Sequence, residues 1–355
     1  MRSHILALSV AAWLATGCSG SSDPDSGLPS LNCTIPSDQI FAGGPGRDGI
    51  PALDLPFLTD VAGASFMVDE HRVLGVEIDG VARAYPLVVM WWHEIVNDTL
   101  ADANVVVSYC PLTGSGLAFD AFVDGALRVF GVSGLLFENN LMMFDRQTNS
   151  IWTQLLMGAQ CGPESGKLLT RLPVVETTGK QWRTAHPETT VLTLDTGFNR
   201  AYGAYPYGDY NLLNNAETLF PSSTFSDARP PKELVLGIQE GSAAVAYPFG
   251  ALADKGDAVA VNDQVGGRSV LVTYLFSQAS ARAFDRNVAG QTLSFTVASE
   301  DPFTLTDNET GSTWDWSGGA IAGPLQGERL TPLEDAWTMF WFAWSVFYPE
   351  TQIAT

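Results

Sequence analysis

YPLVVMWWHEIVNDTLADANVVVSYCPLTGSGLAFD, residues 85–120, contains the strand and helix signals from which we predict the fold class. Residues 105–109 form a run of β-branched and aromatic side chains, which is typical of a buried strand. Residues 86–96 predict a short helix, because the proline at its start has a φ that suits the first turn. Cys110 ends the strand and precedes a second proline, which favours an extended backbone at the cysteine. The stretch therefore predicts a β-rich unit of the α+β class.

The same pattern occurs again in the second half of the chain. Tyr85 and Pro86 recur as Tyr247 and Pro248, an offset of 247 − 85 = 162 residues. Other matches keep offsets between 161 and 165, which coincidence would not produce. These matches are Asn97 with Asn262, Tyr109 with Tyr274, Asp120 with Asp285, Asp145 with Asp307, Trp152 with Trp314, Gly162 with Gly323 and Trp182 with Trp344. We predict a tandem duplication of two similar β-rich units, packed as a pseudo-twofold pair.

The composition along the chain predicts six segments. They are a signal peptide (residues 1–17), a lipidated N-terminus with a flexible tether (18–31), a Gly/Pro-rich covering loop (32–64), a first repeat that carries the candidate site (65–194), an aromatic connector (195–231) and a second, degenerate repeat (232–353). The connector is expected to be ordered, because it contains several tyrosines, among them Tyr202, Tyr205, Tyr207 and Tyr210.

The N-terminus predicts export. Arg2 is followed by an apolar run, residues 5–14, and then by small residues that lead to Cys18. The apolar run is too short for a stable transmembrane helix, which needs about 20 residues. A cysteine directly after small residues resembles the bacterial lipoprotein signal, in which that cysteine carries the lipid. We therefore expect a cell-envelope protein that is anchored to the lipid bilayer through Cys18 and faces the periplasm or the exterior.

The overall composition excludes one class of partner. Hydrophobic residues make up 46% of the chain and charged residues 16%, which is typical of a globular protein. The formal net charge is −21, so nucleic-acid phosphates would be repelled. We expect no nucleic-acid partner, and the sequence does not identify a ligand or a protein partner.

The two copies differ at the aligned positions where the first copy has potentially reactive side chains. Cys110 aligns with Leu275 and His93 with Ala258, so a site would belong to the first copy. We predict that Cys110 and His93 converge, as catalytic or metal-binding residues, in a pocket roofed by residues 43–49. Thiolate and imidazole ligands suit copper or zinc. Two alternatives stay open. Cys110 is then a small core residue, and His93 is a core histidine with satisfied hydrogen bonds.

Once Cys18 carries the lipid, Cys33, Cys110 and Cys161 remain, and an oxidising compartment permits one disulfide among them. Cys33 lies in the N-terminal loop and Cys161 in a turn, and neither belongs to the candidate site. We therefore expect the pair Cys33–Cys161.

Four long motifs resemble the bacterial family catalogued as domain of unknown function 3179. They are GGPGRDGIPALD (residues 43–54), AYPLVVMWWHEIVND (84–98), VVVSYCPLTGSGLAFD (105–120) and GVSGLLFENNLMMFDRQTNSIWTQ (131–154). The family has no established activity, so the resemblance implies no mechanism. Similar proteins often read CPLCG, whereas Thr113 stands here in place of a second cysteine. A disulfide cycle within this motif is therefore excluded.

Two functions follow from different classes of protein. The first is a metal-binding or thiol-redox protein that uses Cys110 and His93. The alternative is a non-catalytic cell-envelope module that binds a partner protein or a saccharide through the connector and a polar cluster. That cluster consists of Asn140, Asp145, Arg146 and Gln154.

Overall fold

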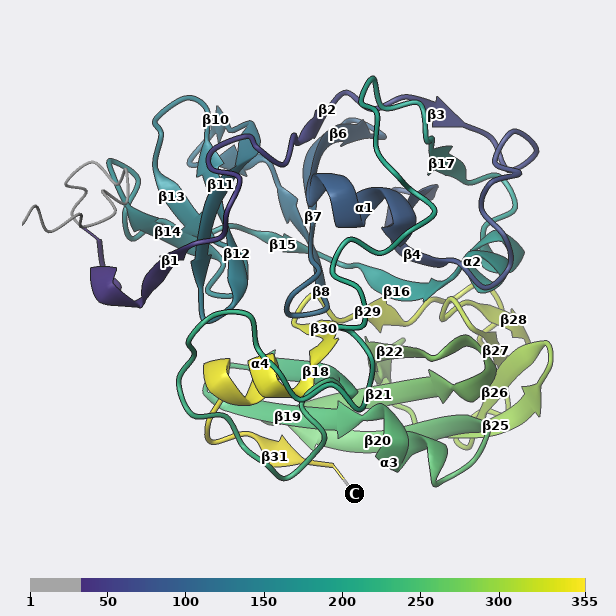
Figure 1. Cartoon of the computed structure of the whole chain (residues 1–355). Coiled ribbons are helices and arrows are strands. Elements are labelled where there is room, and N and C mark those ends of the chain that lie inside the picture. The colour runs from purple at the N-terminus through teal and green to yellow at the C-terminus, as the bar shows by residue number, and fades with distance from the viewer. Residues whose placement is uncertain (1–32, 355) are drawn as a thin grey trace, which may run out of the picture. The chain divides into compact units, whose positions relative to one another are not determined.

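β-Strands dominate residues 33–354, the part of the chain that the computed structural model describes (Figure 1). That part contains eight β-sheets and four short α-helices, so the fold is β-rich as predicted. No helix within residues 33–354 is long and apolar enough to span a bilayer. The predicted signal peptide (1–17) and the predicted tether with Cys18 (18–31) lie outside the described residues.

Three sheets and a hairpin form the first half. The first sheet has the order β16-β4-β5-β17-β3, built from β3 (Leu58–Thr59), β4 (Arg72–Ile78), β5 (Val81–Pro86), β16 (Val175–Thr178) and β17 (Thr190–Leu192). The second has the order β15-β8-β7-β6-β2, built from β2 (Leu53–Asp54), β6 (Ile95–Leu100), β7 (Ala103–Cys110), β8 (Ser115–Asp120) and β15 (Arg171–Leu172). The third has the order β1-β11-β12-β13-β14, built from β1 (Ile40–Ala42), β11 (Phe130–Phe137), β12 (Asn140–Asp145), β13 (Ile151–Thr153) and β14 (Gly158–Cys161). The hairpin pairs β9 (Phe122–Val123) with β10 (Ala126–Leu127).

The second half repeats this strand order. Its first sheet is β30-β18-β19-β31, from β18 (Leu234–Glu240), β19 (Ala243–Pro248), β30 (Ala336–Phe340) and β31 (Gln352–Ile353). Its second is β20-β21-β22-β29, from β20 (Ala258–Val265), β21 (Arg268–Leu275), β22 (Ser280–Asp285) and β29 (Thr331–Pro332). Its third is β25-β26-β27-β28, from β25 (Phe295–Glu300), β26 (Phe303–Asp307), β27 (Thr313–Asp315) and β28 (Ala320–Ala322), and its hairpin pairs β23 (Asn287–Val288) with β24 (Gln291–Thr292). The pseudo-twofold relation between the halves, and the predicted segment boundaries, stay predictions.

Each sheet of the first half has one strand more than its counterpart, and all three extra strands come from the segment before residue 65. β1 adds to β11, β2 to β6 and β3 to β17. The predicted covering loop therefore forms short edge strands, which pair with backbone groups that an open sheet edge would leave exposed.

The same side-chain hydrogen bonds occur at corresponding positions of the two halves. The Tyr85 hydroxyl donates to Asp98 at 2.9 Å, and the Tyr247 hydroxyl donates to Asp263 at 2.8 Å. The Trp152 indole donates to Asp145 at 2.9 Å, and the corresponding bond of the second half has the same length. These bonds satisfy polar groups in both cores, so the repeated residues hold the scaffold together.

A glycine in the central strand of each half makes room for a tryptophan. A Cβ atom at Gly75 would lie 2.2 Å from the Trp182 ring, and one at Gly237 would lie 2.0 Å from the Trp344 ring. These tryptophans belong to two of the four helices, which are α1 (Leu87–His93), α2 (Gly179–Ala185), α3 (Phe249–Ala253) and α4 (Trp341–Phe347). The close packing explains why tryptophan and glycine recur together.

Helix α1 ends earlier than the sequence predicts. Pro86 precedes it, as expected, but the helix stops at His93 because Glu94 has a φ of 59°. That left-handed conformation cannot continue a right-handed helix, and the chain turns directly into β6.

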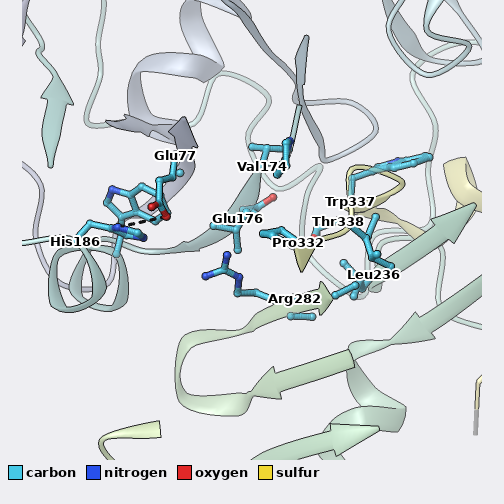
Figure 2. A pocket seen from close by; sticks show the side chains of 17 residues that line it. Glu77, Val174, Glu176, His186, Leu236, Arg282, Pro332, Trp337 and Thr338 are labelled. Atoms are coloured by element: carbon cyan, nitrogen blue, oxygen red, sulfur yellow. Dashed lines mark ion pairs between the residues drawn. The ribbon is translucent and has the colours of Figure 1, made fainter. Parts of the chain in front are cut away.

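A cavity of only about 40 Å³ lies where the two halves meet (Figure 2). Among its lining residues are Glu77, Glu176 and Arg282. His186 also lines it, with its ring 4.1 Å from that of Trp182 and its Nδ1 3.9 Å from a Glu77 carboxylate oxygen. In the second half Tyr348 packs on Trp344 in the same way, with the rings 4.3 Å apart. His186 therefore has the packing role of Tyr348.

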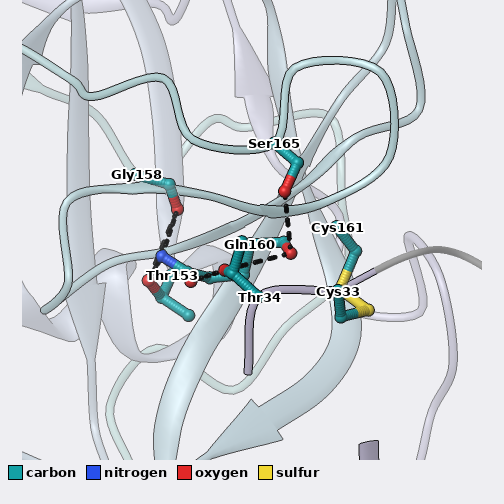
Figure 3. Close-up of a disulfide and its surroundings, with 7 residues drawn as sticks. All are labelled: Cys33, Thr34, Thr153, Gly158, Gln160, Cys161 and Ser165. Atoms are coloured by element: carbon teal, nitrogen blue, oxygen red, sulfur yellow. Dashed lines mark hydrogen bonds between the residues drawn. A yellow bond between two sulfur atoms is a disulfide. The ribbon is translucent and has the colours of Figure 1, made fainter. Parts of the chain in front are cut away.

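A disulfide joins Cys33 to Cys161, the two cysteines that the sequence analysis pairs (Figure 3). The neighbouring residues reinforce the junction, because the Thr34 backbone N–H donates to the Gln160 carbonyl at 2.7 Å. The Ser165 hydroxyl donates to the same carbonyl at 3.2 Å. The start of the described chain is thereby fixed to β14.

We expect removal of the disulfide to lower the free energy of unfolding. Cys33→Ser with Cys161→Ser releases a cross-link that spans 128 positions, which is worth roughly 3–5 kcal/mol on the chain-entropy model. Denaturant unfolding without reductant measures the loss. Peptide mapping of the wild type is the control, and a map in which Cys110 is disulfide-bonded would contradict the assignment.

Candidate functional site

Cys110 lies at the end of β7, and its thiol is almost completely buried. It is the free cysteine among those in residues 33–354. Its Sγ accepts a hydrogen bond from the Leu141 N–H at 3.3 Å and donates to the Asn139 carbonyl at 3.6 Å. Thr113, three residues further along, also donates to the sulfur through its backbone and side chain. The sulfur therefore faces several donors that would stabilise a thiolate.

A cavity of about 100 Å³ adjoins the thiol. Leucine and valine side chains form most of its wall, and the polar side chains that line it besides Cys110 belong to Glu94 and Tyr207. Gly43 and Pro45 complete it, so part of the predicted roof, residues 43–49, does cover Cys110. The roof is held by backbone hydrogen bonds to β11, including one from the Gly43 N–H to the Gly134 carbonyl at 2.7 Å.

Glu94 is the acidic residue of this cavity. It follows α1 in the left-handed conformation, its N–H donates to the Met90 carbonyl and its carbonyl accepts from the Tyr109 N–H, both at 2.8 Å. A non-glycine residue in this conformation is uncommon, and such strain concentrates at functional sites. The backbone thus fixes the carboxyl beside the strand that ends at Cys110.

Burial shifts the pKa values of both groups upward. Desolvation raises the pKa of Glu94 to about 8, although a hydrogen bond with Tyr207 lowers it in part. Burial, together with the negative charge of Glu94, raises the pKa of Cys110 to about 11, and hydrogen bonds from Thr113 and Leu141 limit the rise. Near neutral pH the site therefore contains a protonated carboxyl and a protonated thiol.

His93 does not line the cavity beside Cys110, and both nitrogens of its ring have other partners. Its Nδ1 lies 2.7 Å from the Pro51 carbonyl and its Nε2 lies 2.6 Å from the Tyr202 hydroxyl. A carbonyl can only accept, so Nδ1 carries the proton and Nε2 accepts from Tyr202. Burial lowers the pKa of His93, which keeps the ring neutral. Neither nitrogen is left for a metal ion, and the histidine instead positions the residue that follows it.

The connector holds the site closed through its tyrosines. Tyr205 and Tyr210 donate to the carbonyls of Pro111 and Leu112, at 3.1 and 2.9 Å, directly after the cysteine. Tyr207 contacts Glu94, and Tyr202 contacts the preceding histidine as described. These four hydroxyl groups therefore tie the connector to the stretch that carries the site.

Two predicted substrate-binding residues, Asn140 and Gln154, form a buried network instead. The Asn140 amide donates to the Gln154 carbonyl oxygen at 2.8 Å, and the Ser115 hydroxyl donates to the same oxygen at 2.7 Å. The Gln154 amide donates to Ser108 at 3.0 Å, and Asn140 donates to Thr113 at 3.0 Å. The network fixes the turn after Cys110, and its side chains are too buried to contact a saccharide.

The other two predicted binding residues also have structural partners. Asp145 is fully buried and accepts hydrogen bonds from Trp152 and Thr148, the arrangement that recurs around Asp307. Arg146 forms a bidentate ion pair with Asp48 at 2.9 and 3.0 Å. The four residues do not form one surface site.

The strand register identifies what replaces this site in the second half. Cys110 pairs with Ser115 across β7 and β8, and Leu275 pairs with Ser280 in the same place. By the same register Val259, which pairs with Tyr274, stands where Glu94 stands beside Tyr109. Sequence reasoning missed Glu94, although comparing it with Val259 would have found it. Tyr207 gave no comparable signal, because the connector is not repeated.

The side chains present do not fit a copper or zinc site. Among the described residues no group of three or more histidine, cysteine, aspartate or glutamate side chains is placed to hold a metal ion. Cys110 and Glu94 supply two ligands, whereas zinc requires at least three from the protein, and a carboxylate is a hard ligand for Cu(I).

Comparison with known proteins gives a family but no activity. The family described as "Protein of unknown function (DUF3179)" matches residues 47–351. No curated protein and no solved structure matches the chain.

The raised pKa of Glu94 predicts a pH dependence of stability. The folded protein holds this proton up to about pH 8, whereas the unfolded chain releases it near 4.5. The stabilising effect is therefore complete below the unfolded value and is lost as the pH rises to about 8. We expect the free energy of unfolding, measured with denaturant at several pH values, to fall less steeply over this range in Glu94→Gln than in the wild type.

The two slopes must be compared with each other, because histidines titrate in the same range. The pKa values of His93 and His186 are lowered, so these residues make stability rise with pH in both proteins. Equal slopes for the variant and the wild type would contradict the assignment of a neutral Glu94.

Proposed function

We propose that this chain, which belongs to the family of unknown function matched over residues 47–351, is an exported, lipid-anchored protein with a thiol-dependent site in its first half. The observation that carries the proposal is that the buried Cys110 thiol and the buried Glu94 carboxyl share one cavity. Both positions are apolar in the second half, where Leu275 and Val259 fill them. A protein that needed only a core at this place would not bury an acid beside a thiol.

The pair is arranged for nucleophilic chemistry by sulfur. Glu94, once ionised, accepts the proton of Cys110 as the sulfur attacks a small electrophile. A bond forms between sulfur and the electrophilic atom, the bond to the leaving group breaks, and the proton passes from Glu94 to the leaving group. The N–H groups of Leu141 and Thr113 stabilise the negative charge on sulfur before attack.

The thiol-redox form of this chemistry needs a second molecule. If the electrophile is a disulfide, Cys110 takes one of its sulfurs and the other leaves as a thiol. Cys33 and Cys161 are joined to each other, and Thr113 has no sulfur, so a second thiol from outside must release the product.

Two other functions have less support. A metal-binding function lacks ligands, because the His93 nitrogens have partners and the thiol and carboxyl alone are too few. A saccharide-binding function through the polar cluster lacks an accessible surface, because Asn140 and Gln154 are buried.

We expect the pH dependence of the rate of Cys110 modification to reflect the ionisation of Glu94. A small neutral reagent, methyl methanethiosulfonate, should label Cys110 at a rate that rises as the pH passes about 8, the pKa of Glu94. In Glu94→Gln the step centred on about pH 8 should disappear, and the rate should rise steadily with pH as the buried thiol itself titrates, since burial raises the pKa of Cys110. Intact mass measured over time at each pH gives the rate.

Glu77→Gln is the matched control, because this acid lies at the separate cavity between the halves and should leave the profile unchanged. Cys110→Ser should remove labelling altogether. The proposal fails if the profile of Glu94→Gln superimposes on that of the wild type.

A further inference from the structure

A second, larger cavity lies between the two halves, separate from the one beside Cys110. Its volume is about 470 Å³, within the range of small-molecule sites. Residues of the first half, the connector and the second half all line it, so both halves are needed to form it. Aromatic rings form much of the wall, from Trp91, Tyr109, Phe249, Tyr274, Phe276 and Phe340. Such a wall favours a flat apolar ligand.

Two tyrosines at corresponding positions line this cavity, one from each half. Tyr109 pairs with Gly116 across β7 and β8, and Tyr274 pairs with Ala281 across β21 and β22, so the strand register matches the two tyrosines. Successive side chains of a strand point to opposite faces, so Tyr109 faces away from the thiol of Cys110. Three more pairs of corresponding positions line the cavity, Arg72 with Leu234, Leu87 with Phe249 and Trp91 with Ala253. The cavity therefore lies between matching faces of the two halves.

The hydroxyl groups of these two tyrosines have no hydrogen-bond partner within residues 33–354. Tyr85 and Tyr247, which also recur, each bond an aspartate instead. The polar side-chain atoms of the described residues that are both unpaired and completely covered by protein include neither hydroxyl oxygen of Tyr109 and Tyr274, so each oxygen keeps accessible area. Both side chains are otherwise buried, at 7% and 3% exposed, and the open space that they line is this cavity. Polar groups inside a protein normally have partners, so two free hydroxyls at one cavity indicate a ligand.

The charges of the cavity wall show where the two hydroxyls lie and in which state. Desolvation raises the pKa of Tyr109 and of Tyr274, so both hydroxyls hold their protons at neutral pH. The positive charge of Arg72, which lines the cavity, lowers both pKa values in part, so this guanidinium lies near both hydroxyls. A protonated phenol donates a hydrogen bond. The cavity therefore offers two hydrogen-bond donors close to one part of its wall.

The charged groups of the wall already have partners. Arg72 donates to Glu176 and to two backbone carbonyls of the second half. Glu233 accepts from Arg229, and the Lys232 ammonium donates to a carbonyl of the connector. A charged ligand would find no free counter-charge among the described residues of the wall, whereas an uncharged ligand can use the two hydroxyls.

The internal repeat explains the size of the cavity, and exposed apolar side chains border it. Ala253 is the fifth residue of α3, and Trp91 is the fifth residue of α1. An indole ring is thus missing on the side of the second half, and this leaves space. Leu213 of the connector is 59% exposed and Phe276 is 54% exposed, and both line the cavity. An apolar molecule can therefore enter from solvent.

We propose that this cavity binds a small uncharged molecule with a flat apolar body and a carbonyl oxygen, which accepts hydrogen bonds from the hydroxyls of Tyr109 and Tyr274. The aromatic wall contacts the flat body, and the hydroxyls select the oxygen. A carbonyl oxygen has two lone pairs, so one such group can accept from both tyrosines. The site does not depend on the thiol chemistry proposed above, because Tyr109 and Cys110 point to opposite faces of their strand.

Two probes that differ only in a carbonyl group test this on the intact protein. 9-Fluorenone carries one carbonyl on a flat aromatic body, and fluorene has a methylene group in its place. Equilibrium dialysis with each compound gives its affinity and stoichiometry, and the ratio of the two affinities isolates the contribution of the carbonyl. We expect one molecule of either compound to bind per chain.

Tyrosine-to-phenylalanine variants remove the donors and keep the rings. In the double variant Tyr109→Phe with Tyr274→Phe, the affinity of fluorenone relative to fluorene should fall about tenfold, because two hydrogen bonds of ordinary strength are lost. Each single variant should give part of this loss, and fluorene itself should bind as it does to the wild type. Tyr348→Phe is the matched control, because this partly buried tyrosine does not line the cavity and should leave the ratio unchanged.

A further variant locates the binding. Ala253→Trp fills the cavity with the side chain that the first half has at this position, and should weaken both compounds at least about tenfold. Ala322→Trp, on the exposed part of β28, is its control and should leave both affinities unchanged. Circular dichroism verifies that each variant is folded.

Three outcomes overturn the proposal. Absence of binding in the wild type, or undiminished binding in folded Ala253→Trp, would mean that the cavity is not a ligand site. An unchanged ratio of affinities in the double phenylalanine variant would mean that the tyrosine hydroxyls select no carbonyl.

Discussion

The burial of the Glu94 carboxyl next to the Cys110 thiol is the constraint on which the rest of the site depends. An acid without an ionic partner is unfavourable in a core, and its pKa of about 8 reflects that desolvation. The surroundings compensate in part: Tyr207 hydrogen-bonds the carboxyl, and the connector closes over the stretch on both sides. The left-handed backbone at Glu94 and the engaged ring of His93 keep the acid in place. The connector therefore acts as part of the site.

The duplicated architecture separates scaffold from site. Bonds such as those of Tyr85 with Asp98 and of Tyr247 with Asp263 occur in both halves, and they satisfy groups that any copy must bury. The thiol and carboxyl occur only in the first half, where residues 33–64 add an extra edge strand to each sheet and roof the cavity.

Much of the fold could be predicted from the sequence, because recurring apolar, turn and tryptophan positions report on packing that both halves share. Cys110 and the loop above it could also be predicted, since Leu275 marks the position as free to change. The partners of His93 could not be predicted, because its ring nitrogens contact Pro51 and Tyr202, which are distant in sequence. The contact between Tyr207 and Glu94 joins residues more than a hundred positions apart in sequence, and no local pattern encodes it. Asn140 and Gln154 are buried for the same kind of reason, a tertiary network around one turn.

We infer that the thiol and the acid are additions to a scaffold that does not need them. The free energy of unfolding of the double variant Glu94→Gln with Cys110→Leu is the decisive quantity, because this variant removes the acid and the thiol without placing a β-branched side chain at the positive φ of residue 94. The adjoining cavity of about 100 Å³ can take the larger leucine, and the variant no longer buries an acid. We expect this variant to be as stable as the wild type at pH 7 or more stable. A variant that fails to fold, or that loses several kcal/mol, would mean that the pair belongs to the scaffold and would contradict the account.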